Sequence, residues 1–548
     1  MHLSTSYYPP VAHQKQNPKR SSQSTAATHW RFALDSEYEQ LVDANTWTLV
    51  SRSEAQNVIS GKWVFKIKLK EDGTVDRYKA RWVARGFSQK LDIDYTEIFA
   101  PVIRYSSVRL LLSLANAFDL NVYGLDVSNA FARADVDENL FVEMPHGYKQ
   151  LDKNGKPLVC KLSKGLYGTK QAARLWNQKF RHMLLSTGWR QYESDPCIYS
   201  RYTSKNGHEI VGVYVDDIIH IANSLSIHTA FHDSCNKSFP TTTQGEIHWL
   251  LGMHIQRNRA TRTLTINQTQ SILRNLEEWE MTTVKSLPTP MDSQWKYGDE
   301  PAVTDPDKHK MFRSRVGSLS YYSQCTRPDI AYAVNCLCRH LHDPNPACFR
   351  ALNHLIHYMA GTPHLGIKYQ IGDSSTLRLE EYFPTSPAGT DPILSAYSDA
   401  SWGGENCDSA KSQSGYIVYF GGGPIDWKSH LQPVIAQSST ESEQVAAHET
   451  ARSVFYFRQL LEEFGKTQTG TTVIWEDNQG CIAQSKNPVN SSRSKHILLK
   501  YHYLRDLTES GIVRLQYIPT TDQIADIFTK PLPGKQFINL SRFLVHPC

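Results

Sequence analysis

The sequence predicts an α+β fold over most of the chain and a smaller α/β domain at its C-terminal end, each with carboxylates at strand ends. In the first part, two apolar runs typical of buried strands, Val122–Leu125 and Ile210–Val215, lead into Asp126 and into the adjacent Asp216 and Asp217. Neighbouring carboxylates beside buried strands repel one another and lose hydration unless a divalent cation compensates their charge. Two Mg²⁺ ions about 3.5–4 Å apart can hold the attacking and leaving oxygens of an in-line phosphoryl displacement. The pattern therefore predicts a metal-dependent nucleotidyl-transfer site.

A second group of acids lies in residues 393–548. Strand-like runs end at Asp399 and near Asp477, a long helix carries Glu443, and a short helix after a further strand carries Asp526. Strand-end acids joined by one helical Glu can converge on a metal pair, so this region is predicted to hold a second site.

Each acid of the second group has an alternative role. Glu443 lies three residues after Thr440, which is the spacing of a capping box. Asp477 precedes Asn478 and could form a turn or a helix cap. Asp522 competes with Asp526 for the fourth position, although the spacing from the preceding strand favours Asp526.

The composition is that of a globular protein of several domains, since 548 residues allow about 100–200 residues for each. Apolar residues make up 40% of the chain, whereas the net charge of +5 is too small to indicate a nucleic-acid partner. The ten cysteines show no C-x₂-C spacing, which is typical of reduced thiols in an intracellular protein. The chain lacks an apolar run of membrane-spanning length and a signal-peptide core, so we expect a protein that is neither secreted nor membrane-bound.

Between Gly61 and Gly86 the sequence predicts a two-stranded ribbon with one basic face. Apolar and basic residues alternate with period two, and Asp72-Gly73 supplies a hairpin turn. The segment has eight Lys or Arg residues against three acids. Such a face either contacts phosphate groups or keeps an edge strand from aggregating. The aspartates downstream favour contact with a nucleotide or template.

The other segments are expected to support these sites. Residues 1–28 contain no Asp or Glu and many Ser, Thr and Gln, and they predict a disordered, mildly basic arm whose simplest interpretation is a linker. Residues 372–392 form a second, long linker, which predicts a loosely placed last domain. Helices are expected at residues 105–118 and 170–188 of the α+β part, and further helices, without a catalytic constellation, at residues 312–322, 330–341 and 347–359.

Several ordered motifs resemble the polymerase of copia-type LTR retrotransposons. Tyr214-Val215-Asp216-Asp217 resembles the YxDD box of reverse transcriptases, and residues 125–131 resemble their first palm motif. Other stretches that read as this family are residues 62–66, 77–81, 99–102, 165–168, 326–332 and 527–532.

The resemblance implies a right-hand polymerase of fingers, palm and thumb, followed by a connection region and a C-terminal α/β ribonuclease H-like domain. The implied boundaries are 1–28 for the disordered arm, 29–245 for fingers and palm, 246–300 for a thumb-like region and connector, 301–371 for a helical connection, 372–392 for the linker and 393–548 for the ribonuclease H-like domain.

The resemblance also assigns roles in the polymerase. Asp126 and Asp216 would hold both metals, and Asp217 would support the site or bind the primer-side metal. The implied cofactor is Mg²⁺, two ions per active site, with Mn²⁺ as the alternative. Lys79 is expected on the triphosphate, and Phe131 would block a ribose 2′-hydroxyl. The full set of expected substrate contacts is Lys79, Arg81, Arg85, Val127, Phe131, Lys164 and Gly165.

In the nuclease, Asp399, Glu443, Asp477 and Asp526 match the D-E-D-D set of ribonuclease H and would bind two metals. Residues 493–496 are either a contact for the hybrid or a solvated basic turn. The chain departs from the family at Gln444, where an aromatic is usual, and at Glu476, where a Cys is usual. These departures keep open a polymerase with a silent nuclease.

The resemblance predicts an RNA-directed DNA polymerase with ribonuclease H activity. Its partners would be an RNA template, a DNA primer, the RNA–DNA hybrid, dNTPs and other element proteins of a virus-like particle, in a cytoplasmic particle or the nucleus. The alternative is a decayed or domesticated copy that binds nucleic acid without catalysis. Protease, zinc-knuckle and integrase motifs are missing from the sequence, so we expect it to match the C-terminal portion of a longer polyprotein.

Overall fold

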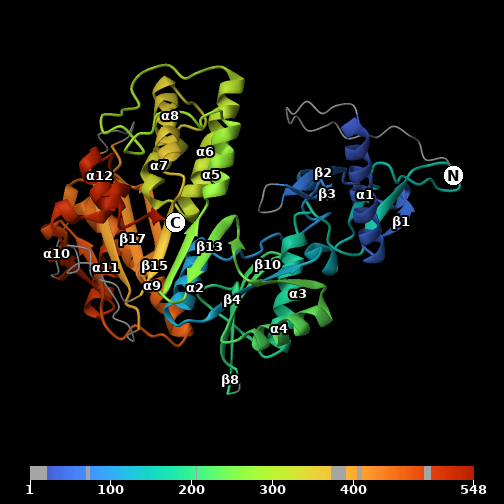
Figure 1. Ribbon diagram of the computed structural model, residues 1–548, viewed down its shortest axis with the longest axis horizontal. Coiled ribbons are helices and arrows are strands. Elements are labelled where there is room, and N and C mark those ends of the chain that lie inside the picture. Colours follow the sequence, from blue (N-terminus) through green and yellow to red (C-terminus); the bar gives the residue numbers. More distant parts are fainter. Residues whose placement is uncertain (1–20, 70–73, 205, 372–390, 404–409, 487–494) are drawn as a thin grey trace.

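The computed structural model describes residues 21–548 except 70–73, 205, 372–390, 404–409 and 487–494. The N-terminal elements (blue) and the C-terminal domain (red) lie at opposite ends, with green strands between them and helices α5–α8 above (Figure 1). In the described part of the chain, no helix is both long and apolar enough to cross a membrane.

The fingers contain the predicted ribbon. Strands β2 (Gly61–Leu69) and β3 (Val75–Ala84) pair in antiparallel register, while the turn expected at Asp72-Gly73 lies outside the described residues. Beside the ribbon, a three-stranded sheet has the order β1-β6-β5, formed by β1 (Trp47–Ser51), β6 (Leu158–Leu162) and β5 (Phe141–Glu143).

Helix α1 (Ser21–Asp43) corrects one expectation, because it begins inside the segment 1–28 that was expected to be disordered. The helix packs on β3, and the Trp30 ring makes edge contacts with Phe65 at 5.1 Å and Tyr78 at 4.7 Å between ring centroids. This tertiary contact stabilises a helix that the polar composition alone does not predict.

The palm is a six-stranded sheet of order β11-β4-β10-β9-β8-β7 with three helices. The strands are β4 (Asn121–Val127), β7 (Arg190–Gln191), β8 (Ile198–Thr203), β9 (Gly207–Tyr214), β10 (Asp217–Ala222) and β11 (Thr241–Glu246), and the helices are α2 (Tyr105–Ala117), α3 (Ala172–Ser186) and α4 (Leu225–Ser238). The helices expected at 105–118 and 170–188 are confirmed as α2 and α3.

The thumb-like and connection regions share one five-stranded sheet of order β12-β13-β14-β15-β21. Its strands are β12 (Trp249–Leu250), β13 (Met253–Asn258), β14 (Thr263–Asn267), β15 (Leu365–Gln370) and β21 (His546–Pro547), and the adjoining helices are α5 (Thr269–Glu278), α6 (Pro306–Cys325), α7 (Ala331–Cys338) and α8 (Pro346–Gly361). The three helices expected at 312–322, 330–341 and 347–359 are confirmed as α6, α7 and α8. The last strand of the chain, β21, pairs with β15, so the C-terminal end of the chain joins the sheet of the connection region.

The C-terminal domain has a sheet of order β18-β17-β16-β19-β20, in which β16, β19 and β20 are parallel. The strands are β16 (Ser395–Ser401), β17 (Gln413–Phe420), β18 (Gly423–Leu431), β19 (Thr472–Glu476) and β20 (Val513–Tyr517), and the helices are α9 (Ser439–Glu463), α10 (Gln479–Lys486), α11 (Lys495–Glu509) and α12 (Gly534–Ser541). This is the α/β domain that the sequence predicts.

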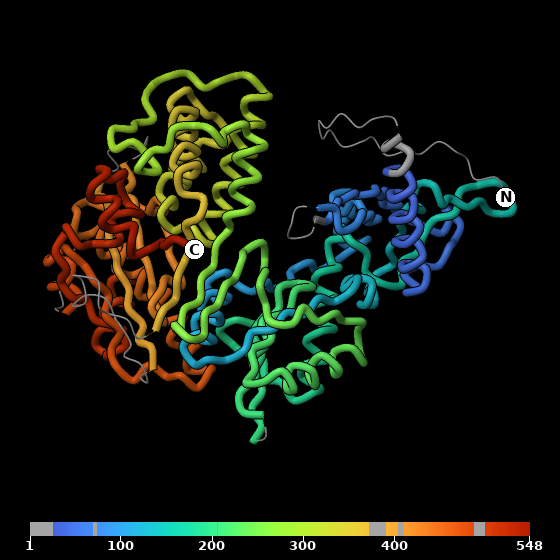
Figure 2. Tube along the Cα trace, in the orientation of Figure 1, coloured from blue at the N-terminus to red at the C-terminus, as the bar shows by residue number. Residues whose placement is uncertain are grey.

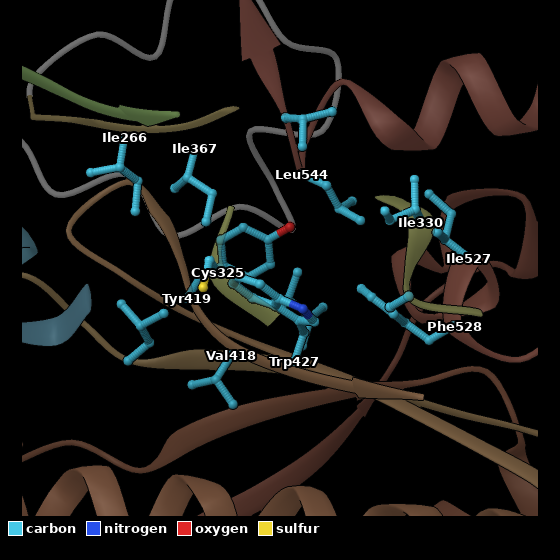
Figure 3. Packing of buried hydrophobic residues seen from close by; sticks show 14 of the residues in the cluster. Ile266, Cys325, Ile330, Ile367, Val418, Tyr419, Trp427, Ile527, Phe528 and Leu544 are labelled. Carbon is cyan, nitrogen blue, oxygen red and sulfur yellow. The ribbon is translucent and has the colours of Figure 1, made fainter. Parts of the chain in front are cut away.

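The C-terminal domain is firmly packed on the polymerase, contrary to the expectation of loose placement. The chain leaving the fingers runs to α2 at the side of this domain (Figure 2), where α2 contacts β18. Buried side chains from the thumb-like sheet, the connection and the C-terminal domain form one cluster, and Cys325, Trp427 and Leu544 lie together in it (Figure 3). The Arg109 side chain of α2 is buried in this interface and its Nε donates to the Ile425 carbonyl at 2.7 Å.

Candidate active sites

The palm aspartates meet at a tight hairpin. Strands β9 and β10 are joined by Val215 and Asp216 alone, and the register places Asp217 opposite Tyr214 on one side and Asp126 of β4 on the other. The Asp216 carbonyl accepts the Val127 N–H at 3.2 Å, which ties the hairpin to β4. The three predicted carboxylates are therefore brought together at one end of the sheet.

The hairpin tip has an unusual backbone. Val215 has φ of 58°, in the left-handed region that a β-branched residue rarely occupies. The Trp176 indole donates to the Val215 carbonyl at 2.6 Å and holds the turn in this conformation. Strained residues of this kind persist where the surrounding structure imposes a functional geometry.

The charges of the palm fit a divalent cation. Burial, followed by repulsion from Asp216 and Asp126, raises the pKa of Asp217 to about 6. Burial and Asp216 also raise the pKa of Asp126, whereas Lys79, Arg81 and Lys68 oppose this rise. Because these carboxylates destabilise one another when ionised, a bound divalent ion would relieve the repulsion.

Two of the expected substrate contacts lie around Tyr167. The Arg81 guanidinium stacks 4.4 Å from the Tyr167 ring centroid, and Phe131 meets the same ring edge-on at 4.8 Å. Lys79 is half-buried, and burial together with Arg81 and Arg77 lowers its pKa. Lys79 and Arg81 are thus cations whose charges act on Asp126.

Gly165 allows the chain to approach Phe131 closely. A Cβ at this position would lie 2.6 Å from the Phe131 carbonyl oxygen, which any larger residue would have to displace. The Gly165 N–H donates to the Ala134 carbonyl at 2.8 Å. The position of Phe131 therefore depends on a glycine 34 residues later in the sequence.

The structure gives other partners to three predicted contacts. Lys164 forms an ion pair with Asp135, and hydrogen bonds from Lys164 and Lys179 lower the pKa of Asp135 to about 2. The Val127 N–H is already bonded to Asp216. The Arg85 side chain is exposed beyond the end of β3, and the backbone N–H of this residue donates to the Ser60 carbonyl at 2.8 Å. Their roles in substrate binding remain predictions, although Lys164 would have to leave its carboxylate partner.

The second site joins three of its four predicted acids. Asp399 lies on β16, Asp477 follows the parallel neighbour β19, and Glu443 lies on α9, so that one oxygen of each lies within 4.8 Å of the others. The Thr520 hydroxyl donates to Asp477 at 2.8 Å. This arrangement offers oxygen ligands that suit a hard divalent cation.

The helix-capping roles that the sequence left open for Glu443 and Asp477 are filled by neighbouring residues. Ser438 caps α9 by accepting the Glu441 N–H at 3.2 Å, and Asn478 accepts the Cys481 N–H at 2.9 Å at the start of α10. The carboxylates of Glu443 and Asp477 therefore need not serve as helix caps.

The fourth predicted acid has a protein partner. Asp526, in the 3₁₀ turn Ile524–Phe528, lies outside the three-acid group, and its Oδ1 is 2.8 Å from the Lys530 ammonium. Lys530 also lies 4.0 Å from Asp399, and the Thr529 hydroxyl donates to Asp399. Burial, followed by Asp399, raises the pKa of Asp526 to about 8 despite Lys530. The sequence interpretation missed Lys530, although its i,i+4 spacing from Asp526 is the spacing of a helical ion pair.

Glu476 is buried at the end of β19, beside Asp477. Gln444, the other departure from the family pattern, donates to Gln484 of α10 and thus has a structural contact. Of the basic segment 493–496, residues 493 and 494 lie outside the described residues.

Residues 44–293 match the model of the family described as reverse transcriptase (RNA-dependent DNA polymerase). They form a reverse transcriptase-family domain. The match includes the ribbon, Asp126 and the Asp216–Asp217 hairpin, and it ends before α6.

Relatives extend the similarity beyond this reverse transcriptase domain. The chain is 36% identical over 510 residues to the retrovirus-related Pol polyprotein from transposon TNT 1-94 of Nicotiana tabacum, with 92% of this chain and 37% of the relative covered. It is also 36% identical over 532 residues to that from transposon RE1 of Arabidopsis thaliana, with 96% and 34% covered. The chain thus spans about a third of the length of these curated relatives, and the predicted resemblance to a retrotransposon polymerase is confirmed.

Among solved structures, a foamy viral protease-reverse transcriptase in complex with double-stranded DNA aligns with 94% of this chain and 73% of its own chain at 11% identity. Its TM-score of 0.44 is too low to establish a shared fold.

Proposed function

We propose that the chain is an RNA-directed DNA polymerase with an associated ribonuclease H activity, which copies retrotransposon RNA into DNA and degrades the RNA of the hybrid. The observation that supports it most is the meeting of Asp126, Asp216 and Asp217 at one hairpin within a reverse transcriptase-family domain. The similarity to transposon Pol polyproteins supports element RNA as the template.

Both centres would hold divalent cations, Mg²⁺ or Mn²⁺, two in each. In the palm the ligands are Asp126, Asp216 and Asp217, and the bound ions would activate the attacking oxygen and compensate the charge of the leaving group. Lys79 and Arg81 would bind the triphosphate, because both cations act on the Asp126 carboxylate from the adjacent ribbon. Phe131, held by Gly165 and Tyr167, would exclude the 2′-hydroxyl of a ribonucleotide by its bulk.

The nucleic-acid partners are an RNA template, a DNA primer and their hybrid, with dNTPs as substrates. A copying enzyme must accept any template sequence, so contacts between phosphates and the basic face of β2 and β3 should dominate binding and make it strongly salt-dependent. In the C-terminal domain, Asp399, Glu443 and Asp477 would hold the metals for cleavage of the RNA strand, with Asp526 beside them.

The alternatives are a decayed copy and a polymerase with a silent nuclease. Neutral decay tends to lose essential acids, yet all seven predicted acids are present, which argues against a decayed copy. The pairing of Asp526 with Lys530 is the observation that favours a silent nuclease.

Primer extension and hybrid cleavage by the full chain test the proposal. The parent should extend a DNA primer on an RNA template in Mg²⁺ and cleave the RNA of a hybrid. Asp217→Asn should abolish extension and leave cleavage, Glu443→Gln should do the reverse, and Asp233→Asn, an exposed acid of α4, should change neither. Absence of extension by a folded parent that binds the hybrid would establish the decayed copy instead.

A further inference from the structure

Glu476 is a buried carboxylate with an unsatisfied oxygen. The residue is 0% exposed, and its Oε1 accepts the Asn478 N–H at 3.1 Å. Among the described residues, none donates a hydrogen bond to Oε2. A buried polar atom without a partner is costly, and a buried carboxylate more so, which calls for a compensating group.

Glu476 is the strongest charged neighbour of Glu443, one of the acids of the nuclease centre. Burial and then Glu476 are the main causes that raise the pKa of Glu443 well above its usual range. Within the described part of the chain, Glu443 Oε2 is also buried without a hydrogen-bond donor. Two buried carboxylates from α9 and β19 therefore each leave one oxygen unsatisfied beside Asp399 and Asp477.

The nearby cation is directed elsewhere. The Lys530 ammonium contacts Asp526 at 2.8 Å and approaches Asp399 at 4.0 Å. Lys530 also opposes the rise in the pKa of Glu443, but in the described structure its ion pairs are with Asp526 and Asp399 and not with Glu443 or Glu476.

We propose that Glu476 is a positioning residue of the nuclease centre, whose buried carboxylate acts through Glu443 to strengthen divalent-cation binding. This inference rests on the proposed metal-dependent nuclease. Glu476 lies outside the group of acids whose oxygens converge, so its effect is that of an outer carboxylate, which adds negative charge and orients the inner ligand. The cation in turn relieves the repulsion between the two buried glutamates. The domain keeps this arrangement at a cost to its stability when no metal is bound.

Metal binding, measured apart from catalysis, tests the proposal. The full chain with Asp126→Asn and Asp217→Asn, which weaken the palm site, is titrated calorimetrically with Mn²⁺. Adding Glu476→Gln should weaken the remaining binding by about 10- to 100-fold, the range for outer partners of metal ligands. Glu476→Asp should retain most of the affinity. The matched control Glu509→Gln, an exposed acid of α11 paired with Arg505, should have no effect.

Thermal unfolding in EDTA gives a second readout. Glu476→Gln should raise the metal-free Tm because Gln removes a carboxylate that is costly to bury, and it should reduce the increase in Tm that Mn²⁺ produces. A lower Tm with unchanged Mn²⁺ affinity would show a purely structural role and overturn the inference.

Glu443→Gln separates the inference from the proposed function. Loss of binding in Glu443→Gln with parental affinity in Glu476→Gln would overturn the role of Glu476 and leave the metal centre intact. Parental affinity in both variants would remove the metal centre, and the inference with it.

Discussion

The motif at residues 326–332 forms a buried ion pair whose loss should be strongly destabilising. Arg327 and Asp329 both have side chains that are 0% exposed, and they are joined by two hydrogen bonds, Nε to Oδ1 at 2.9 Å and Nη2 to Oδ2 at 2.7 Å. Arg327 also donates to the carbonyl of Thr362 at 2.7 Å and to its hydroxyl at 2.9 Å. The Tyr358 hydroxyl donates to Asp329 at 2.7 Å. The pair thus ties the start of α7 to the end of α8.

Arg327→Met should destabilise this region by about 3–5 kcal/mol. The substitution keeps the side-chain volume similar but leaves the Asp329 charge buried, with the Tyr358 hydroxyl as its one remaining side-chain donor among the described residues. Removing one partner of a buried pair has this magnitude. Because each 1.4 kcal/mol is about tenfold, amides of α7 and α8 should exchange with solvent at least ~100-fold faster. Hydrogen exchange followed by mass spectrometry measures this locally in a protein of several domains.

Two further variants test whether the loss in Arg327→Met comes from the unpaired buried charge of Asp329. Arg350→Met on α8 removes an ion pair with Glu300 whose side chains are 64% and 41% exposed, and it should leave stability nearly unchanged because solvent screens exposed pairs. The double variant Arg327→Met/Asp329→Leu should lose less than the sum of its single variants, because no charge remains unpaired. If Arg327→Met accelerated exchange no more than Arg350→Met does, the argument from the buried charge would be wrong.

Two other predictions concern buried polar groups. Burial lowers the pKa of both His220 and His228, the latter to about 4, so the folded chain binds fewer protons than the unfolded one below about pH 6.5. Stability should therefore fall as the pH decreases from about 6.5 to 4, and His228→Gln should reduce this fall in urea midpoints measured at pH 7.5 and 5. Arg109 donates to the Ile425 carbonyl and stacks 3.8 Å from the Trp427 ring centroid, so Arg109→Met should lower the hydrogen-exchange protection of α2 by about 2–4 kcal/mol. Arg109→Lys should recover only part of this loss, because the ammonium keeps the charge but not the stacked, planar guanidinium, and full recovery would mean that charge alone matters.

Much of the palm site could be predicted because its signals are local. A strand repeats every two residues, so the alternation around Trp63 predicts the ribbon, and apolar runs ending at Asp126 and Asp216 predict strand ends that carry acids. Only Val215 and Asp216 separate the two strands of the hairpin, so the positions of Asp216 and Asp217 at its tip depend on neighbouring residues rather than on distant segments. Glu443 and Asp477 were predicted for the same reason, as acids at defined positions on a helix and at a strand end.

Other features depend on contacts between distant segments. Lys164 forms its ion pair with Asp135, which lies 29 residues earlier in the sequence. Helix α1 packs on the ribbon, although the composition of the first residues of α1 predicts disorder. Arg109 lies in an apolar helix, yet its partners come from α6 and β18, more than 200 residues away. Lys530 is the exception, since its spacing from Asp526 was a local signal.

The sequence alone thus predicted acids that the structure brings together, Asp126 with Asp216 and Asp217, and Asp399 with Glu443 and Asp477, because periodicity and strand ends are properties of neighbouring residues. Only the tertiary structure decided which of those carboxylates are compensated, with Asp526 paired to Lys530 and Glu476 left beside Glu443. The reason is physical: burial and charge pairing depend on which distant segments pack together, and a buried charge is stabilised or destabilised by its partner rather than by its place in the chain.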